Sequence, residues 1–464
     1  MANISFGTDG FRGILNQDFT EDNVKIIVKA CAKYIIEKYG KNKKIVVGYD
    51  PRNQAKEYAA ITGELLTQYG FDVCVSKKVI PTPIIAFCAK YYNACAFMFT
   101  ASHNPPEYLG IKFIPDFGGP ATSDITDKIT EYFNDNKNFV SKKSGNFIDL
   151  ELEKPYFEHI KKLIDIKKIK KVKSNIIFDG LYSSTIGYFD KFLEGNEISF
   201  EKINCFHDIN FGGGMPDPKP KYLKALIEKI KTKSNTIGLA NDGDGDRYGV
   251  INEKGEYVTP NEIMGILLTH LIKNKKAEGA LAITVAGSSM LKILAKKLGV
   301  KFIETPVGFK WLGEAMRNNN VILAGEDSGG LSICSHIPEK DGILANLLIL
   351  EAMGYEEKSL VELQKELHNF VGVTFIQNRL DYKFNDKEAM KIMIDKISSI
   401  NDFPYKIVAE NKIDGLKISF DNDSWILVRP SGTEPLLRVY FEAQSQNLEE
   451  LKTFVDKKVK FFME

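Results

Sequence analysis

A serine on a predicted loop is placed to act as a nucleophile. Ser102 lies in the segment TASHNPPEYLGIKF, at 100–113, between two apolar runs that are typical of buried strands. Pro105 and Pro106 exclude a helix here, because proline lacks an amide donor and pushes the residue before it toward extended geometry. Ser102 is therefore expected on a stiff loop. A lone loop serine is usually a solvated turn residue, so the interpretation depends on the other polar loops.

A second loop is rich in carboxylates. The segment NDGDGDR places three of them two residues apart: Asp242, Asp244 and Asp246. The glycines between them allow the backbone to curl, so the carboxylates can converge on one hard divalent cation. A calcium-binding EF-hand loop does not fit, because Arg247 stands where that loop needs glycine and the flanking segments are typical of strands. Three carboxylates with coordination positions left over fit Mg²⁺, and a solvated acidic turn is the alternative.

A third loop offers groups that bind sugar hydroxyls. The segment AGEDSGG, at 324–330, follows a buried strand and carries Glu326 and Ser328. These residues stand two apart, so a carboxylate and a hydroxyl group can face the same side. A capped helix start is the alternative. The segment HIPEKDG, a few residues farther on, adds His336 and Lys340 as candidate binding residues.

A fourth loop combines the groups that phosphate binding requires. The segment RPSGTEP, at 429–435, offers guanidinium and hydroxyl groups and a glycine that lets backbone amides approach closely. An ordinary turn explains this loop nearly as well when the loop is judged alone. The candidate phosphate-binding residues are Arg429, Ser431, Gly432, Thr433 and Arg438.

Composition is that of a globular protein with no bulk preference for polyanions. Lysine and arginine total 62 against 61 aspartate and glutamate residues, so no overall charge favours nucleic acid or an anionic membrane. The first residues show no signal peptide, and no window reaches the ~18 apolar residues that a membrane span needs. We expect a cytoplasmic protein whose six cysteines, which form no CxxC pair, remain reduced.

Helical and strand patterns alternate along the first 370 residues, which predicts an α/β fold. Strand-to-loop transitions after Asp50, Asp179 and Val285 recur at domain-sized intervals and suggest one plan used three times. The last part of the chain, with four predicted strands and two predicted helices, indicates a smaller α+β domain. The expected domains are 1–150, 151–255, 256–370 and 371–464.

The motifs TASHNPP, DGDGDR, GEDSGG and RPSGTEP, in this order, resemble the loops of the α-D-phosphohexomutase superfamily, which includes phosphoglucomutase and phosphomannomutase. We call these segments the serine loop, the metal loop, the sugar loop and the phosphate loop. The resemblance covers essentially the whole chain. It implies a heart-shaped α/β architecture of four domains, in which three similar α/β domains and a C-terminal α+β domain surround a central cleft.

The resemblance also implies roles for single residues. Ser102 is expected to bear the phosphoryl group, and its oxygen is expected to join the three aspartates in holding Mg²⁺. His103, Lys112 and Arg247 complete the expected catalytic set, with Lys112 a candidate for proton transfer. Substrate contacts are expected from Arg12 and from the residues of the sugar and phosphate loops named above.

Enzymes of this superfamily interconvert hexose 1-phosphate and hexose 6-phosphate through a phosphoserine and hexose 1,6-bisphosphate, which also serves as activator. The resemblance implies a small-molecule sugar phosphate as the partner of a monomer or weak dimer. GEDSGG followed by HIPEKDG is similar to the phosphoglucomutase type, and Gly330 and Phe309 stand where relatives that accept mannose phosphates often carry histidine. Glucose is therefore the expected sugar, with mannose left open and glucosamine or pentose phosphates ranked lower.

Two other functions are open at this point. A non-catalytic sensor could bind a sugar phosphate with the same loops, although the retention of Ser102 with all three aspartates argues against it. A phosphatase could use the same serine and transfer the phosphoryl group to water, and it would release free phosphate faster than it forms an isomer.

Overall fold

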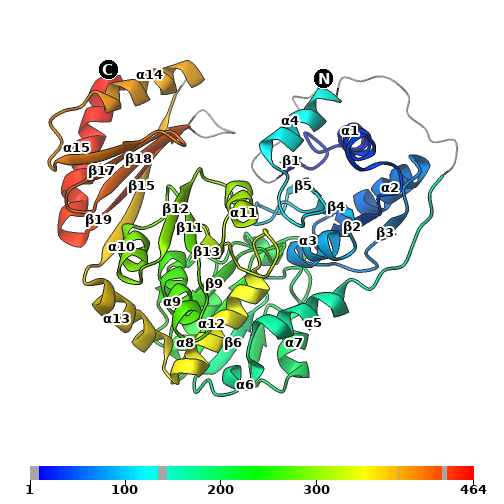
Figure 1. Cartoon of the computed structure of the whole chain (residues 1–464), viewed down its shortest axis with the longest axis horizontal. Helices are drawn as coiled ribbons and strands as arrows, with labels where there is room; N and C mark the ends of the chain where they lie inside the picture. Colours follow the sequence, from blue (N-terminus) through cyan, green and yellow to red (C-terminus); the bar gives the residue numbers. More distant parts are fainter. Residues whose placement is uncertain (1–9, 134–143, 385, 431–435, 464) are drawn as a thin grey trace.

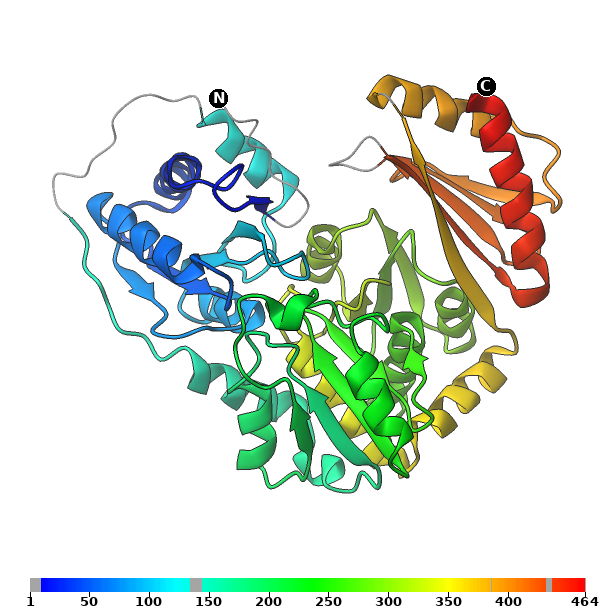
Figure 2. The same ribbon diagram turned by 180° about the vertical axis from the view of Figure 1, so that it is seen from behind.

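The computed structural model of the chain describes residues 10–133, 144–384, 386–430 and 436–463 (Figure 1). These residues form four domains, numbered I to IV along the chain, and each domain is built on one sheet. The domains follow one another along an arc, so that domain I and domain IV stand at its two ends (Figures 1 and 2).

Domain I consists of β1 (Phe11–Ile14), α1 (Glu21–Tyr39), β2 (Ile45–Tyr49), α2 (Ala55–Gln68), β3 (Val73–Val75), α3 (Thr82–Tyr91), β4 (Cys95–Phe99), β5 (Tyr108–Ile114) and α4 (Ser123–Glu131). The strands β2, β3 and β4 are parallel, and β5 runs antiparallel to β4 and β1. Every residue of β4 is buried, because Ala96 and Met98 face the core that contains α3 while Phe97 and Phe99 face the core that contains α1. An uninterrupted apolar run is what a strand covered on both faces requires.

Domain II consists of α5 (Glu153–Leu163), α6 (Ile166–Ile169), β6 (Asn175–Asp179), α7 (Phe189–Gly195), β7 (Glu201–Ile203), η1 (Phe211–Gly213), α8 (Lys224–Lys231), β8 (Thr236–Asn241), β9 (Tyr248–Ile251) and β10 (Tyr257–Val258). Domain III consists of α9 (Pro260–Lys273), β11 (Ala280–Thr284), α10 (Ser289–Lys297), β12 (Lys301–Thr305), α11 (Phe309–Asn318), β13 (Val321–Gly325), β14 (Leu331–Ile333), α12 (Gly342–Glu356) and α13 (Leu360–Val371). Because β10 pairs with β9, the second sheet extends past the expected limit at 255. The expected domain limits, that at 255 included, stay predictions.

Domains I, II and III share one strand order. The orders β5-β4-β2-β3, β9-β8-β6-β7 and β14-β13-β11-β12 each combine three parallel strands with one antiparallel strand at the same end of the order, and β1 and β10 extend the first two sheets beyond β5 and β9. The antiparallel strand follows directly after its neighbour, and the connections are the serine loop, the metal loop and the sugar loop. The predicted use of one plan three times is confirmed, and it places the three polar loops at equivalent positions of their domains.

Domains I to III pack as one block. A single hydrophobic core includes residues of all three, and it contains α12, whose sides are buried almost all round. The even burial explains why the sequence of α12 is apolar without a polar face. Domain IV has a separate core and meets domain III through a small cluster: Val285, Ala286, Trp425 and Leu427.

Domain IV consists of β15 (Phe375–Lys383), α14 (Lys387–Ser398), β16 (Ile407–Asn411), β17 (Leu416–Phe420), β18 (Trp425–Pro430), β19 (Leu436–Gln444) and α15 (Ser445–Met463). Its sheet is antiparallel throughout, with the order β15-β19-β18-β17-β16, and α14 and α15 pack against it (Figure 1). The sequence predicted four strands and missed β16. This edge strand, IVAEN, has no buried residue and therefore lacks the alternation that marks a half-buried strand. The predicted α+β character of the domain is confirmed.

Two predictions from composition concern the whole chain. No helix in the described ranges is both long enough and apolar enough to cross a membrane. The six cysteines are free thiols, and four of them are buried: Cys31, Cys74, Cys88 and Cys95. The burial of these four agrees with the prediction of core thiols, and Cys205 and Cys334 are partly exposed.

Candidate active site

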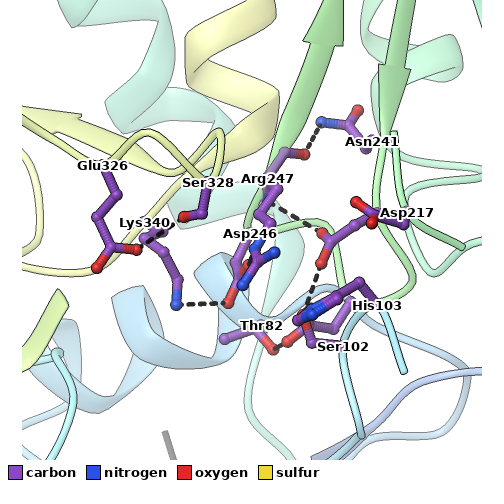
Figure 3. Close-up of polar contacts among 12 residues, drawn as sticks. Thr82, Ser102, His103, Asp217, Asn241, Asp246, Arg247, Glu326, Ser328 and Lys340 are labelled. Carbon is purple, nitrogen blue, oxygen red and sulfur yellow. Dashed lines mark hydrogen bonds and ion pairs between the residues drawn. The ribbon is translucent and has the colours of Figure 1, made fainter. Parts of the chain in front are cut away.

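The serine loop joins β4 to β5 and turns Ser102 toward domain II (Figure 3). The Ser102 side chain is buried, and its Oγ donates a hydrogen bond to Asp242 Oδ2 at 2.7 Å. The backbone of Ser102 has a φ of +51°, in the left-handed region that residues other than glycine rarely adopt. The Ser102 amide donates to Thr100 Oγ1 at 2.8 Å, and Arg12 Nη1 donates to Asn104 Oδ1 at the same distance. These bonds hold the loop in a conformation that points the hydroxyl group at the acids.

The metal loop joins β8 to β9 and brings three fully buried carboxylates together: Asp242, Asp244 and Asp246. One oxygen of each lies within 4.8 Å of the others. Gly245 has a φ of +76°, which allows the tight turn between the second and third carboxylates. A Cβ at Gly243 would lie 2.5 Å from the carbonyl oxygen of Ser102, so only glycine lets the metal loop approach the serine loop this closely.

Two buried lysines offset part of the negative charge. Lys112 Nζ lies 2.9 Å from an oxygen of Asp244 and 2.9 Å from an oxygen of Asp246. Lys340 Nζ lies 3.2 Å from the same oxygen of Asp246. Burial, together with the charges of the neighbouring aspartates, nevertheless raises the pKa of Asp242 well above its ordinary value. The two lysines therefore neutralise only part of the negative charge of the three aspartates.

The donor set fits Mg²⁺. Three carboxylates and a serine hydroxyl group are hard oxygen ligands, and they leave coordination positions for water or a phosphate oxygen. The buried Oδ1 of Asp246 has no hydrogen-bond partner among the described residues, and Arg247 Nε lies 4.0 Å from it. A divalent cation between the carboxylates would satisfy such an oxygen and would lower the repulsion that raises the pKa of Asp242.

A neutral histidine lies beside the serine. His103 Nδ1 is 3.3 Å from Ser102 Oγ. The charge of Arg247, followed by burial, holds the pKa of His103 well below its ordinary value, so the ring carries no charge at neutral pH. A neutral imidazole nitrogen at this position can accept a proton from the serine oxygen or return one to it.

The sugar loop is attached to the metal loop through the backbone. Arg247 and Gly330 form an antiparallel bridge, which brings the end of the metal loop against the end of the sugar loop. Ser328 Oγ donates to Glu326 Oε2 at 2.9 Å, so the carboxylate and hydroxyl groups lie together, as the spacing of these residues predicts (Figure 3). The acids and the sugar-binding candidates therefore belong to one continuous site.

Domain IV carries two of the predicted phosphate-binding arginines on adjacent strands. Arg429 on β18 and Arg438 on β19 stand directly opposite each other, so both project from the same face of the sheet. Arg429 Nη2 lies 3.0 Å from Asp414 Oδ2, an oxygen that also accepts the Val307 amide of domain III at 2.9 Å. Like charges at opposite positions repel, which favours an anion near them. Three other predicted phosphate contacts lie outside the described residues: Ser431, Gly432 and Thr433.

Family models match the chain along most of its length. Those for the phosphoglucomutase/phosphomannomutase alpha/beta/alpha domains I, II and III match residues 3–139, 154–255 and 259–370, and that for the C-terminal domain matches 383–458. The chain belongs to the phosphoglucomutase/phosphomannomutase family. The family that the four loops resemble is confirmed, and with it the four-domain phosphohexomutase architecture.

Known phosphohexomutases similar to this chain act on different sugars, by their names. A phosphoglucomutase/phosphomannomutase of Thermococcus kodakarensis is 31% identical over 455 residues, which cover 95% of each chain. A phosphoglucosamine mutase of Clostridioides difficile is also 31% identical, over 97% of each chain. The crystal structure of a candidate phosphomannomutase from Thermus thermophilus is 29% identical, covers 98% of this chain and 99% of its own, and has a TM-score of 0.86. These comparisons establish the mutase family and leave the sugar to be determined.

Gly330 and Lys340 share one space in this phosphohexomutase. A Cβ at Gly330 would lie 2.4 Å from Cδ of Lys340. The methylene groups of Lys340 therefore occupy the volume that a side chain at 330 would need. Glycine at 330 lets the Lys340 ammonium reach Asp246, so the two positions are sterically coupled.

His336 does not fit its predicted role as a substrate contact. Its side chain has no exposed area, and its two ring nitrogens lie 2.8 Å from Asp341 Oδ2 and 3.1 Å from His159 Nε2. Tyr156 donates to the same oxygen of Asp341 at 2.7 Å. Because both nitrogens face protein groups in the interior, His336 supports the segment that carries Lys340 and does not face a ligand.

Two residues that shape the phosphohexomutase site were not predicted. Thr82, at the beginning of α3, donates from Oγ1 to Asp244 Oδ2 at 2.6 Å. Arg52, in the turn after β2, donates to carbonyl oxygens of the serine loop, including that of Ser102. The position of Arg52 after the carboxyl end of a parallel strand is a usable signal, since ligand sites of α/β folds collect there. A threonine at a helix start carries no such signal, because it is also typical of a cap.

Proposed function

We propose that this phosphohexomutase interconverts hexose 1-phosphate and hexose 6-phosphate, with glucose as the preferred sugar, through a phosphoserine at Ser102. The observation that carries the proposal is the 2.7 Å hydrogen bond from Ser102 Oγ to Asp242 Oδ2, at the edge of the acidic cluster. Burying three carboxylates beside a hydroxyl group is unfavourable unless they are paired or hold a metal, and the two lysines offset only part of their charge. Mg²⁺ held by the aspartates and the serine oxygen would offset the charge of a phosphoryl group in transfer.

The proposed transfer needs no reactant besides the sugar phosphate. The bond between Ser102 Oγ and phosphorus breaks, and a bond forms between phosphorus and the free hydroxyl oxygen of the sugar. The proton of that hydroxyl moves to Ser102 Oγ, and we assign the relay to the neutral imidazole of His103, whose Nδ1 lies 3.3 Å from Ser102 Oγ and which gives up one proton as it takes up the other. Lys112 and Arg247 supply positive charge beside the reacting groups. The second phosphate of the hexose 1,6-bisphosphate then returns to the serine, after the intermediate has exchanged its two ends.

The remaining loops have to bind either end of this intermediate. Glu326 and Ser328 lie together in the sugar loop, and we assign them to the sugar hydroxyl groups. Arg429 and Arg438 project from one face of domain IV, and we assign them to the phosphate that is not being transferred. Arg12 holds the serine loop through Asn104, and we assign it to a contact between this loop and a bound phosphate.

Two alternatives to glucose are open in this proposal. The conjunction of GEDSGG and HIPEKDG, with Gly330 and Phe309 in place of histidine, supports glucose and leaves mannose as the first alternative. A relative that is 31% identical over nearly the full chain is named phosphoglucosamine mutase, which makes glucosamine phosphate the second candidate. The bisphosphate of the same sugar would serve as the activator in either case.

Initial rates decide between the sugars. We would compare glucose, mannose, glucosamine and ribose 1-phosphates in the presence of Mg²⁺ and the matching bisphosphate, and we expect the highest kcat/KM for glucose 1-phosphate. A higher value for glucosamine 1-phosphate would select the second candidate. Release of free phosphate faster than isomer formation would identify a phosphatase, and binding without turnover would identify a sensor.

A further inference from the structure

Arg52 is a buried residue to which the proposed reaction assigns no role. It follows β2, and its side chain has no exposed area. Its two terminal nitrogens donate to three backbone carbonyl oxygens of the serine loop and to that of Tyr108, the first residue of β5. The distances are 2.7 Å to Ser102, 2.6 Å to Asn104, 2.7 Å to Pro105 and 3.0 Å to Tyr108.

The sequence of the serine loop explains why it needs such a partner. Pro105 and Pro106 contribute no amide donors, and the φ of +51° at Ser102 keeps the chain out of a regular ladder. Buried carbonyl groups require donors from elsewhere. A guanidinium group carries five N–H donors in a planar fork and can serve several carbonyl groups at once, whereas an ammonium group offers three donors from one point.

Two neighbours fix the guanidinium group in place. Asp50 Oδ2 lies 3.2 Å from Arg52 Nε, and Asp50 Oδ1 accepts the Arg52 amide at 3.0 Å. The ring of Phe211, from domain II, lies 4.9 Å from Cζ of Arg52. Arg52 therefore contacts domain I and domain II. The loops of these two domains meet at the hydrogen bond from Ser102 to Asp242.

We propose that Arg52 is a positioning residue that holds Ser102 Oγ against the acidic cluster during phosphoryl transfer. The proposal rests on the proposed function of Ser102. One of the four hydrogen bonds ends on the carbonyl oxygen of Ser102 itself, so the placement of this residue depends on the guanidinium group directly. Displacing a reacting group by about 1 Å can lower a rate about 100-fold, even when the change lies away from the chemistry.

The test compares two substitutions of Arg52 with a matched control. Arg52→Ala removes the donors, and Arg52→Lys keeps the positive charge and most of the bulk but cannot form the fork. Arg379→Lys is the control, since Arg379 lies in domain IV with 48% of its side chain exposed and pairs with Asp381. The measurements are kcat, calculated per mole of protein that can be phosphorylated, and KM. Amide hydrogen exchange is measured across the whole chain.

We expect kcat to fall about 100-fold in Arg52→Ala and by a smaller factor in Arg52→Lys. KM should stay within about threefold, since Arg52 contacts no substrate. Amide exchange should become faster in residues 100–110 and nowhere else, and the control should behave as the wild type. A kcat within about threefold of wild type in both Arg52 variants would overturn the proposal. So would faster exchange throughout domain I, because it marks a general structural role.

Failure of the proposed function would be visible separately. In that case the wild-type protein itself would transfer no phosphoryl group. The exchange measurement alone would then test whether Arg52 holds the serine loop. Faster exchange confined to the serine loop in Arg52→Lys would then support the assignment of Arg52 to this loop. Unchanged amide exchange in both variants would contradict this assignment.

Discussion

Glu442 should make the attachment of domain IV to domain III depend on pH. This carboxylate on β19 is fully buried at the contact between the two domains. Ser288 Oγ, the Ser289 amide, Gln377 Nε2 and Trp425 Nε1 donate to it at distances from 2.7 to 3.2 Å. Ser288 and Ser289 form the beginning of α10 in domain III. The carboxylate therefore joins the sheet of domain IV to the end of a helix in domain III.

Burial raises the pKa of Glu442 from 4.5 to about 7, although the donors oppose the shift. A raised pKa means that the folded, attached state binds the proton more tightly than the unfolded state does. The stabilisation is therefore fully present below pH 4.5 and is lost as the pH rises to about 7. At roughly 1.4 kcal/mol per pKa unit, the loss amounts to about 3 kcal/mol.

Glu442→Gln should remove this pH dependence. The urea-unfolding free energy can be followed by the fluorescence of Trp425 in a Trp311→Phe background, since the chain has two tryptophans. We expect the unfolding free energy of the wild type minus that of the glutamine variant to fall by about 3 kcal/mol between pH 4.5 and pH 8. Glu449→Gln, at a position with 72% of its side chain exposed, is the control and should leave the profile unchanged. If the unfolding free energy of the wild type minus that of the variant stays constant or rises with pH, the donors outweigh burial, and the reasoning is refuted.

Three further changes test the site. Gly330→Ala places a Cβ 2.4 Å from Lys340 Cδ and should lower kcat/KM about tenfold, and unchanged kinetics would contradict the steric coupling. Thr82→Val removes the donor to Asp244 at 2.6 Å, so the Mg²⁺ affinity measured by calorimetry should fall about tenfold, and equal affinity would exclude an orienting role. Asp246→Asn removes one carboxylate of the cluster. Mg²⁺ should raise the Tm of the wild type, EDTA should abolish this rise, and the variant should show none. A rise that persists in the variant would show that the metal binds elsewhere.

The chemistry of the loops could be predicted from the sequence because each motif is contiguous. The carboxylates of NDGDGDR need only the intervening glycines to converge, and the structure brings Asp242, Asp244 and Asp246 within 4.8 Å. The apolar runs around Ser102 likewise predict the strands that hold the serine loop. Local patterns of this kind determine both the elements and the residue types at their ends.

Contacts between distant residues could not be predicted in the same way. Thr82 and Asp244 are 162 positions apart, and Arg52 and Ser102 are 50 apart, so neither pair leaves a pattern in one sequence. His336 was assigned to the substrate because it stands near Lys340, but the fold turns its side chain toward Asp341 and the interior. Tertiary packing, which decides these contacts, is not encoded in the spacing of neighbouring residues.

The central claim is that Ser102 carries a phosphoryl group beside a metal held by the three aspartates, and intact-mass spectrometry of the protein tests it most directly. We predict that glucose 1,6-bisphosphate with Mg²⁺ adds one phosphoryl group to the wild type and that glucose 6-phosphate removes it. Ser102→Ala and the wild type in EDTA should gain none. A phosphoryl group on the Ser102→Ala variant, or an active wild type that never carries one, would contradict the account.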